Sequence, residues 1–329
     1  MYDVSALGEL LIDLTPYNSD QGGQVIFERN PGGAPANVLA GLSKLGKKTC
    51  FIGKVGNDQF GNYLKQVLLD TNISSEGLSF TDKANTTLAI VHLDKNRDRS
   101  FSFYRNPGAD TTLTEADIDE DIIKQSRIFH FGSLTLTNEP SATTTIKAVQ
   151  MAKKLNKVVT YDPNLRVLLW QNLDHARRMM KEGLKYANIV KLSVEELEFI
   201  TDESDFERGT KLLVDQYHTE LIFVTLGAEG CFYRKGEITG KIKSFKVSPV
   251  DTTGAGDGFL SGVLYKILEK DKNIAKLTSD DLNDICIFGN AVGALVTTRK
   301  GAILSMPSKE EIRYLLLNNN IFIDFVANA

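Results

Sequence analysis

An acid beside a glycine-rich turn is the feature of this chain best suited to chemistry. Asp257 follows Gly254-Ala255-Gly256 and opens a stretch whose apolar residues recur at helical spacing. The first N–H groups of such a helix have no internal partners and carry the positive end of its dipole, so they form an anion site. An isolated Asp at this position ordinarily only stabilises the helix. Because the small residues let a ligand reach the backbone here, we expect Asp257 to take a proton from a hydroxyl that receives a phosphoryl group.

A second glycine cluster, Gly32-Gly33-Ala34-Pro35-Ala36-Asn37, also leads into a helical pattern. A tight turn and a helix with proline in its first turn account for part of this pattern. The two glycines also let a polar ligand approach the backbone, where Asn37 could hydrogen-bond it. Upstream, Asp13 lies in an apolar stretch, where a carboxylate is costly unless it is paired. A polyol could pair this carboxylate through two hydroxyls.

Two common nucleotide-binding motifs are nearly matched and fail. Residues 41–48 resemble a Walker A loop, but Lys48 stands where Ser or Thr should meet the metal, and the segment ends a helix instead of opening one. Residues 254–259 resemble the dinucleotide fingerprint, but Phe259 replaces its last glycine. Neither motif therefore explains the glycine turns.

The bulk composition excludes several other classes of protein. The chain has 329 residues, a formal net charge of -4 and a pI near 5.7, so it offers no basic field for nucleic acid. It has no run of eighteen apolar residues and no signal-peptide pattern at Met1, which indicates no membrane span. Its three cysteines, an odd number spaced far apart, are typical of reduced thiols. We therefore expect a cytoplasmic protein.

Short apolar runs alternate with amphipathic helical stretches, which is typical of an α/β fold with a mostly parallel sheet. The predicted strands are residues 4–7, 50–52, 128–131, 158–161, 189–192 and 221–225. The clearest predicted helices start at Pro35 and end before Gly46, start at Gly256, and run from about Leu282 to Arg299.

Two segments interrupt this alternation, at about residues 10–32 and 86–106. The second has two runs of strand-forming residues around a turn-like stretch at 94–98. We expect both segments to form a small antiparallel sheet that lies across one end of the main sheet as a lid. Because no linker or repeat separates these parts, residues 1–329 are predicted to form one domain with this lid inserted.

Together the two glycine motifs resemble the signatures of the PfkB-type carbohydrate kinases of the ribokinase-like superfamily, and the chain is most similar to the fructokinases of that family. Gly32 to Asn37 with the following helix resembles the N-terminal signature, and Asp251 to Asp257 the C-terminal one. Two such motifs in the right order, about 220 residues apart, form a specific pattern. The resemblance covers nearly the whole chain and implies a ribokinase-like α/β fold.

The resemblance also implies roles for individual residues. Asp257 matches the catalytic base, and Gly254, Ala255 and Gly256 match the anion hole for the transferring phosphoryl group. The positions implied to bind the sugar are Asp13, Gly32, Gly33, Asn37, Arg105, Asp162 and Asn164. The positions implied to bind ATP are Lys191, Ser193, Glu196, Thr225, Gly227, Gly230 and Asn290.

Metal ions are implied less directly. Many relatives carry Asn-x-x-Glu near the magnesium and the triphosphate, whereas Ser193 replaces that Asn here. Glu196 could order magnesium-bound water, or it could complete a capping box with Ser193, and the two interpretations are compatible. Asp251 and Thr253 resemble part of a monovalent-cation site, but these two residues alone leave potassium dependence open.

Two segments bear on the choice of sugar, Arg105 to Asp110 and Asp162 to Arg166, and both resemble fructokinase sequences. Without the family, an arginine at a strand edge would be read as a solvated surface residue. With it, Arg105 is implied to contact the sugar and Arg166 to stabilise charge near the γ-phosphate. Kinases of 2-keto-3-deoxygluconate share much of the second segment, so it discriminates between the two sugars less well.

The predicted activity is transfer of the γ-phosphoryl group of ATP to a primary hydroxyl of a ketohexose, with D-fructose O6 as the expected acceptor and Mg²⁺ on the phosphates. Two alternatives stay open. One is a 2-keto-3-deoxygluconate kinase, which would need a further cation in the lid pocket for the substrate carboxylate. The other is a catalytically silent sugar-binding regulatory protein, against which the intact turn before Asp257 argues. The resemblance further implies a homodimer formed through the lid.

Overall fold

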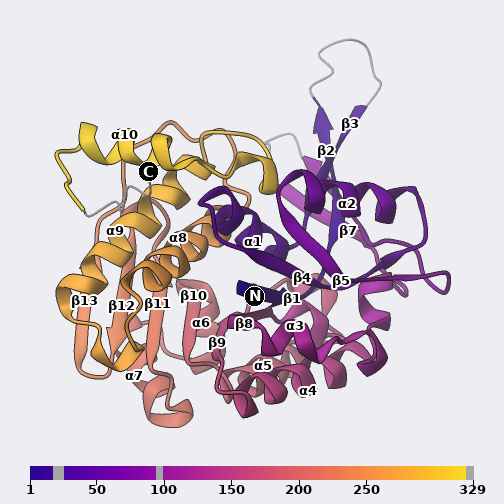
Figure 1. The fold of residues 1–329 in the computed structure, drawn as a ribbon, viewed down its shortest axis with the longest axis horizontal. Helices are drawn as coiled ribbons and strands as arrows, with labels where there is room; N and C mark the ends of the chain where they lie inside the picture. The colour runs from indigo at the N-terminus through magenta and orange to yellow at the C-terminus, as the bar shows by residue number, and fades with distance from the viewer. Residues whose placement is uncertain (18–25, 94–98, 324–329) are drawn as a thin grey trace.

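A computed structural model describes residues 1–17, 26–93 and 99–323. Its main element is a nine-stranded sheet in the order β13-β12-β11-β10-β9-β8-β1-β4-β5 (Figure 1). Neighbouring strands are parallel from β11 to β5, while β12 and β13 pair antiparallel at one edge. The strands are β1 (Tyr2–Leu7), β4 (Thr49–Gly56), β5 (Ile73–Thr81), β8 (Ser126–Gly132), β9 (Val158–Asp162), β10 (Ile189–Ser193), β11 (Leu221–Thr225), β12 (Cys231–Lys235) and β13 (Ile238–Ile242).

Helices cover both faces of this sheet because its central strands are apolar on both sides. In β4, Phe51 packs into one core, while its neighbours Cys50 and Ile52 pack into the other. The first core is closed by α1 (Ala34–Lys44), α2 (Gln59–Asp70), α8 (Ala255–Lys270), α9 (Ser279–Val296) and α10 (Lys309–Asn318). The second is closed by α3 (Glu120–Lys124), α4 (Ser141–Lys154), α5 (Leu173–Leu184), α6 (Val194–Thr201) and α7 (Phe206–Tyr217). The molecule therefore has three layers.

A smaller sheet, which we call the lid, has the strand order β3-β2-β6-β7 and projects from one end of the molecule (Figure 1). Its strands are β2 (Leu11–Tyr17), β3 (Ile26–Gly32), β6 (Leu88–Leu93) and β7 (Arg99–Tyr104). They lie within the two segments predicted to form it, and the turn expected at 94–98 falls outside the described residues.

The lid is not wholly antiparallel. The outer pairs β2–β3 and β6–β7 are antiparallel, as predicted, but the central pair β2–β6 is parallel. The reason lies in the connections, because β2 follows β1 and β6 follows β5, and both parent strands run in the same direction in the large sheet. The pairing holds Asp13 opposite Asn30 on one side and Ala89 on the other.

The six predicted core strands all lie within observed strands, and the first two predicted helices correspond to α1 and α8. The third predicted helix, from about Leu282 to Arg299, was placed three residues too late in the chain. The observed helix α9 begins at Ser279, where Thr278 and Asp281 form a capping box, and ends at Val296. Strands β5, β12 and β13 were missed. β5 and β13 are the two edge strands, and β13 has no buried residue, so its sequence lacks the apolar signal of the central strands; β12 lies next to β13 and is mostly buried.

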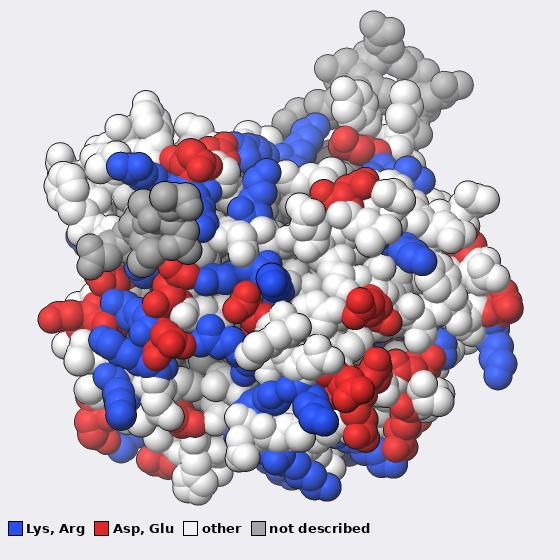
Figure 2. Space-filling model, viewed as in Figure 1, with Lys and Arg blue, Asp and Glu red and all other residues white. Residues whose placement is uncertain are grey.

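The surface carries both signs of charge. On the face seen in Figure 2, basic and acidic side chains are interspersed, which agrees with the small net charge of -4. Within the three described ranges, no helix is long and apolar enough to span a bilayer.

Candidate active site

Two helices bring the two glycine motifs together. Helix α1 starts at Gly33, whose φ of 124° favours glycine and whose Cβ would lie 2.3 Å from the carbonyl oxygen of Glu9. Helix α8 starts at Gly254 with φ 77°. The helices pack closely, because a Cβ on Gly41 would lie 2.2 Å from Ser261 Oγ. Their first turns face each other, and Asn37 Nδ2 donates a hydrogen bond of 2.7 Å to Asp257 Oδ2.

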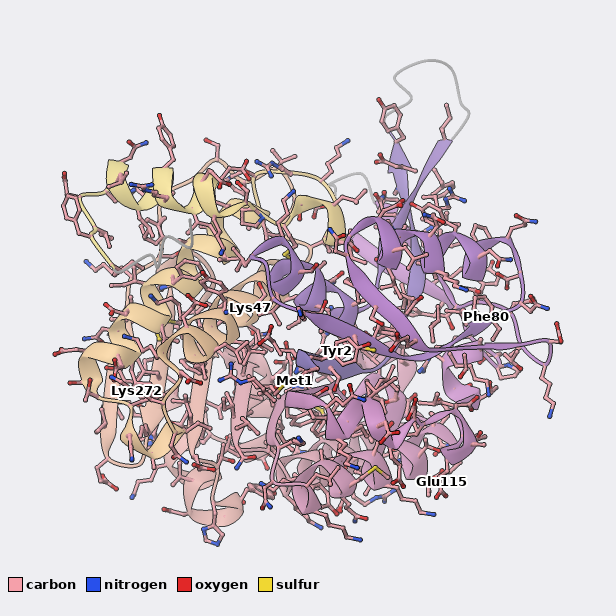
Figure 3. The ribbon with its side chains drawn as sticks, viewed as in Figure 1. Met1, Tyr2, Lys47, Phe80, Glu115 and Lys272 are labelled. Atoms are coloured by element: carbon pink, nitrogen blue, oxygen red, sulfur yellow. The ribbon has the colours of Figure 1, made fainter. Side chains whose placement is uncertain are left out.

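The other ends of these helices are also joined. Lys47, just beyond α1, forms an ion pair with Glu269 of α8 and lies 5.0 Å from the centre of the Tyr265 ring. Figure 3 labels Lys47 at this end of the helix pair. Contacts at both ends therefore fix the axial position of α1 against α8, and with it the distance between Asn37 and Asp257.

Asp257 is a buried carboxyl with a shifted pKa. It is 8% exposed, and burial raises its pKa from 3.8 to about 6, with a further rise from the nearby carboxylate of Asp162. Lys191, the bond from Asn37 and Arg166 act in the opposite direction. A carboxyl whose pKa lies close below neutral pH is ionised at pH 7 and still basic enough to take a proton.

A buried ion pair lies beside this carboxyl. Lys191, in the middle of β10, donates from Nζ to Oδ2 of Asp162, at the end of β9, at 2.9 Å. A Cβ on Gly256 would lie only 2.7 Å from Lys191 Nζ, so the ammonium reaches the backbone of the predicted anion hole. Asp162 Oδ1 is buried and has no hydrogen-bond partner among the described residues. Two neighbouring parallel strands, β9 and β10, thus deliver both charges to the start of α8.

Asp13 and Arg166 complete the open side of the site. Asp13 is partly buried, and burial raises its pKa to about 6; the charge of Arg166 lowers it and that of Asp251 raises it. A Cβ on Gly32 would lie 2.3 Å from Asp13 Oδ2, so the glycine leaves room for this carboxylate. Arg166 is exposed and acts electrostatically on both Asp13 and Asp257. Asn164, partly buried, adopts φ 47° in the loop before Arg166.

Arg105, predicted to contact the sugar, is held mainly by contacts within the protein. Its guanidinium is 8% exposed and makes four hydrogen bonds within the protein, two to Asp110 Oδ2, one to Thr137 Oγ1 and one to the carbonyl of Leu134. Since a guanidinium has five N–H donors, about one is left for a ligand. Its observed contacts fix the segment that follows lid strand β7.

Ser193 and Glu196 do form the capping box that the sequence allowed. Ser193 Oγ accepts from the Glu196 N–H at 3.2 Å, and Glu196 Oε2 accepts from the Ser193 N–H at 2.8 Å. The other carboxylate oxygen, Oε1, accepts from the Leu165 N–H at 2.8 Å. Burial raises the pKa of Glu196, and Lys191 opposes that rise. Glu196 therefore orients the loop that carries Arg166, which the sequence did not indicate.

Four of the seven residues expected around the nucleotide lie at the end of β11, in the turn that follows it and in α9. Thr225 ends β11, and Gly227 stands in the turn after it with no atom within 4 Å of an added Cβ. Gly230 packs against the chain after β13, since its Cβ would meet the Ile242 carbonyl oxygen at 2.0 Å. Asn290 Nδ2 donates to the carbonyls of Ile242 and Lys243 at 3.1 and 3.2 Å. Gly230 and Asn290 thus shape the same segment from opposite sides.

Asp251 and Thr253 form a compact turn before the anion hole. Asp251 Oδ1 accepts from the N–H and the hydroxyl of Thr253 at 2.9 and 2.7 Å, and Oδ2 accepts from the Gly301 N–H at 3.2 Å. The loop at 301–302 also reaches the lid and α8, because Gly301 lies near Asn30 and a Cβ on Gly254 would touch Ala302.

Glu9 is a buried acid at the site that the sequence did not single out. It is 2% exposed, its Oε1 accepts from the Ala34 N–H at 2.7 Å, and its Oε2 has no partner among the described residues. Burial raises its pKa to about 7. Because α1 has no acid in its own first turn, Glu9 supplies the negative charge that the helix N-terminus favours. The only signal in the sequence was an acid directly after the apolar β1.

The donor set suits a divalent cation held through water and phosphate. Within the described ranges, no group of three His, Cys, Asp or Glu side chains is arranged to hold a metal directly. Asp162 Oδ1 is nevertheless an unpartnered buried acceptor, and Glu196 is a buried carboxylate of the same cluster. Mg²⁺ keeps several waters and binds substrate phosphates together with one or two carboxylates, so these residues fit it.

The chain is similar to proteins of known family and fold. The model of the pfkB family carbohydrate kinases matches residues 1–309. Over 319 residues, the chain is 40% identical to probable fructokinase-6, chloroplastic, of Arabidopsis thaliana. The alignment covers 95% of this chain and 82% of that protein. A fructokinase of Xylella fastidiosa with bound ATP is 30% identical, with a TM-score of 0.90 and coverage of 97% and 100%.

A second solved structure carries more ligands. It is a double mutant of the Vibrio cholerae O395 fructokinase with fructose, ADP and a potassium ion bound. It is 32% identical, with a TM-score of 0.86, and the alignment covers 95% of this chain and 97% of that one. The ribokinase-like α/β fold expected from the sequence is thereby confirmed.

Proposed function

The chain belongs to the pfkB family of carbohydrate kinases, and we propose that it transfers the γ-phosphoryl group of ATP to O6 of D-fructose. The observation that carries this proposal is the buried Asp257 carboxyl, held by Asn37 where two glycine-bounded helix N-termini meet. The fructokinase names of similar proteins, and the fructose and ADP in the Vibrio cholerae structure, support the choice of substrates.

In this proposal Asp257 is the general base. Asn37 occupies its Oδ2, so Oδ1 is the oxygen placed to accept the proton of the sugar hydroxyl. Asn37 Oδ1 is buried and has no hydrogen-bond partner among the described residues, so a second sugar hydroxyl would satisfy it. Asp13 and the backbone at Gly32 and Gly33 complete the sugar site. The proton leaves the hydroxyl as its oxygen bonds to the γ-phosphorus and the bond to the β-phosphate oxygen breaks.

Charge on the transferring group is stabilised from the anion hole. We assign this anion hole to the backbone N–H groups of Gly254 and Gly256 at the start of α8, because the N–H of Ala255 already donates to the carbonyl of Thr252 at 3.2 Å. The Arg166 guanidinium, on the exposed side, adds a positive charge that acts on both the sugar side and the base. Thr225, Gly227, Gly230 and Asn290 are proposed to line the rest of the nucleotide. Asp162 and Glu196 are the residues that would hold Mg²⁺ through water, and the ion would supply charge neutralisation at the phosphates.

Arg105, one of the two arginines at the site, is largely unavailable as a partner for the carboxylate of 2-keto-3-deoxygluconate. A substrate carboxylate would need a cation of its own in the lid pocket. Four hydrogen bonds of Arg105 are already made within the protein, and two of them go to Asp110. The positive charge of Arg105 is therefore largely neutralised before any sugar binds.

We also propose that the lid forms a homodimer. Tyr17 of β2 and Ile26 of β3, which lie opposite each other in the lid, are 53% and 56% exposed. Such an apolar sheet face is suited to a second copy of the same sheet. Light scattering after size exclusion should give about twice the mass of 36.4 kDa. A monomeric mass would exclude the dimer and leave the kinase proposal intact.

A coupled assay tests the proposed activity. ATP consumption is followed with fructose, 2-keto-3-deoxygluconate, ribose, tagatose phosphate and nucleosides as acceptors. Fructose should give the highest kcat/KM, and phosphoglucose isomerase with glucose-6-phosphate dehydrogenase should detect the product, because only the 6-phosphate enters that couple. Absence of turnover with fructose would refute the substrate. Absence with every acceptor would favour the catalytically silent sugar-binding alternative.

A further inference from the structure

The ammonium group of Lys191 lies beside the predicted anion hole. Its side chain is 8% exposed, and its ammonium comes so close to Gly256 that a Cβ there would lie 2.7 Å from Nζ. The strand residue Lys191 thus places a full positive charge against the backbone whose amides form the anion hole. One of its three N–H donors goes to Asp162 Oδ2 at 2.9 Å.

The charge on Lys191 is maintained by its surroundings. Burial lowers its pKa, but Asp162, Glu196 and Asp257 together raise the pKa above its ordinary value. A lysine used as a proton donor or acceptor would need a pKa near neutrality instead. The three carboxylates around Lys191 therefore favour its charged ammonium form.

A single ion pair does not explain this arrangement. Taking an ammonium and a carboxylate out of water costs free energy that one hydrogen bond repays only in part, and apolar replacements of such pairs are often no less stable. Here three carboxylates, those of Asp162, Glu196 and Asp257, act on Lys191, so the local charge is set by the site and not by one partner. Anionic phosphate oxygens at Gly256 would be the natural second ligand of the ammonium.

We propose that Lys191 is a catalytic residue that donates a hydrogen bond to an oxygen of the transferring γ-phosphoryl group while it holds Asp162 with another. This role rests on the proposed kinase function. The family resemblance implied only that Lys191 binds ATP. Its position beside Gly256 assigns it to the γ-phosphoryl group and not to the adenine. The negative charge that grows on the phosphoryl oxygens is then met by backbone amides on one side and by the ammonium on the other.

The test replaces Lys191 with Met, which keeps the length of the side chain and removes its charge. Loss of one such donor typically lowers kcat by about 10²–10³-fold, so K191M should lose that much with a fructose KM within about threefold of wild type. The matched control is Lys154→Met on the exposed side of α4, which should change neither value. A kcat of K191M within about threefold of wild type would overturn the proposal.

A second measurement separates catalysis from a structural role, and the kinase proposal from this one. Isothermal titration of ATP and of ADP needs no sugar turnover. K191M should bind ATP more weakly than wild type by about tenfold or more, while ADP affinity stays unchanged, since only ATP carries the γ-phosphoryl group. Equal losses for both nucleotides would show that the substitution merely disturbs the fold, and would overturn the proposal even if the wild-type enzyme phosphorylates fructose.

Chemical rescue provides a third comparison. Lys191→Ala leaves a space at Gly256 that ethylammonium fits, so added ethylammonium should raise its kcat, whereas tetramethylammonium at equal ionic strength should not, because it has no N–H donor. Rescue by both salts alike, or by neither, would contradict a hydrogen bond from the ammonium. If the wild-type enzyme turns over no sugar, the kinase proposal fails in that assay, and the comparison of ATP with ADP still decides the role of Lys191.

Discussion

The hydrogen bond from Asn37 to Asp257 sets the pH range of the reaction, and Asn37→Leu is the substitution that tests this. Leu has nearly the shape of Asn and cannot donate the bond of 2.7 Å. A hydrogen bond to a charged group contributes about 1.5–3 kcal/mol. At 1.36 kcal/mol per pKa unit, its loss should raise the pKa of Asp257 by about 1–2 units. The pKa of about 6 in the native protein would then become about 7–8 in the variant.

The direction of the rate effect follows from the chemistry of the base. In the proposed mechanism Asp257 takes a proton only when it is ionised, so kcat/KM should fall as pH drops below the pKa of this carboxyl. At pH 7 the ionised fraction should decrease from about nine tenths in the native enzyme to between about a half and a tenth in the variant. The variant should regain this loss above pH 9, although a weaker sugar site lowers its kcat/KM at every pH.

The assay measures kcat/KM for fructose from pH 5 to 9.5 at constant ionic strength. The matched control is Asn283→Leu in α9, which removes the oxygen that accepts a hydrogen bond from the Tyr233 hydroxyl. In this control, the pKa that governs the fall of kcat/KM at low pH should stay at about 6. Thermal unfolding of both variants checks that each is folded. The reasoning is refuted if Asn37→Leu lowers the rate by the same factor at every pH, because the bond would then not govern the base.

Further predictions concern three other residues. Asp257→Asn should lower kcat by about 10²–10⁴-fold with little change in ATP affinity, as measured by steady-state kinetics and calorimetry, and full activity would remove Asp257 from the role of base. Gly33→Ala should lower Tm and raise the fructose KM, because its Cβ would lie 2.3 Å from the Glu9 carbonyl oxygen; an unchanged Tm would mean that the turn relaxes freely. The pKa of Glu9 is raised from 4.5 to about 7 in the folded protein, so the wild type should lose stability as pH rises through this window. Glu9→Gln has no such carboxyl and should not lose that stability, so its free energy of unfolding should rise relative to that of the wild type. Chemical denaturation at pH 5 and pH 7.5 measures this difference, and an equal stability gap at both values would contradict the buried carboxyl.

The predicted family and fold are confirmed, and the reason is local. Strands such as Ile189–Ser193 are apolar on both faces, and the helix after Gly254 is preceded by a turn that only small residues allow, so both features are visible in short windows of sequence. Edge strands such as β13 are half polar and lacked that signal.

The arrangement of the site was predictable in part. The sequence indicated that the turns at Gly33 and Gly254 belong to one site, but the roles given to individual residues stay predictions. It did not indicate the parallel pair β2–β6 or the four internal hydrogen bonds of Arg105, since these depend on where distant segments meet. Glu9 was missed for a related reason, because its partner Ala34 is 25 positions away.

The bond between Asn37 and Asp257 has a consequence for how the active protein is made. Its two residues are 220 positions apart in the chain. At the ordinary speed of translation, roughly 10–40 s separate the synthesis of the first from that of the second. The sugar-side residues therefore wait, without their base, until α8 has been made and has docked on α1. Regain of activity after refolding should accordingly trail the recovery of helical signal, so that catalysis reports the last long-range closure of the chain.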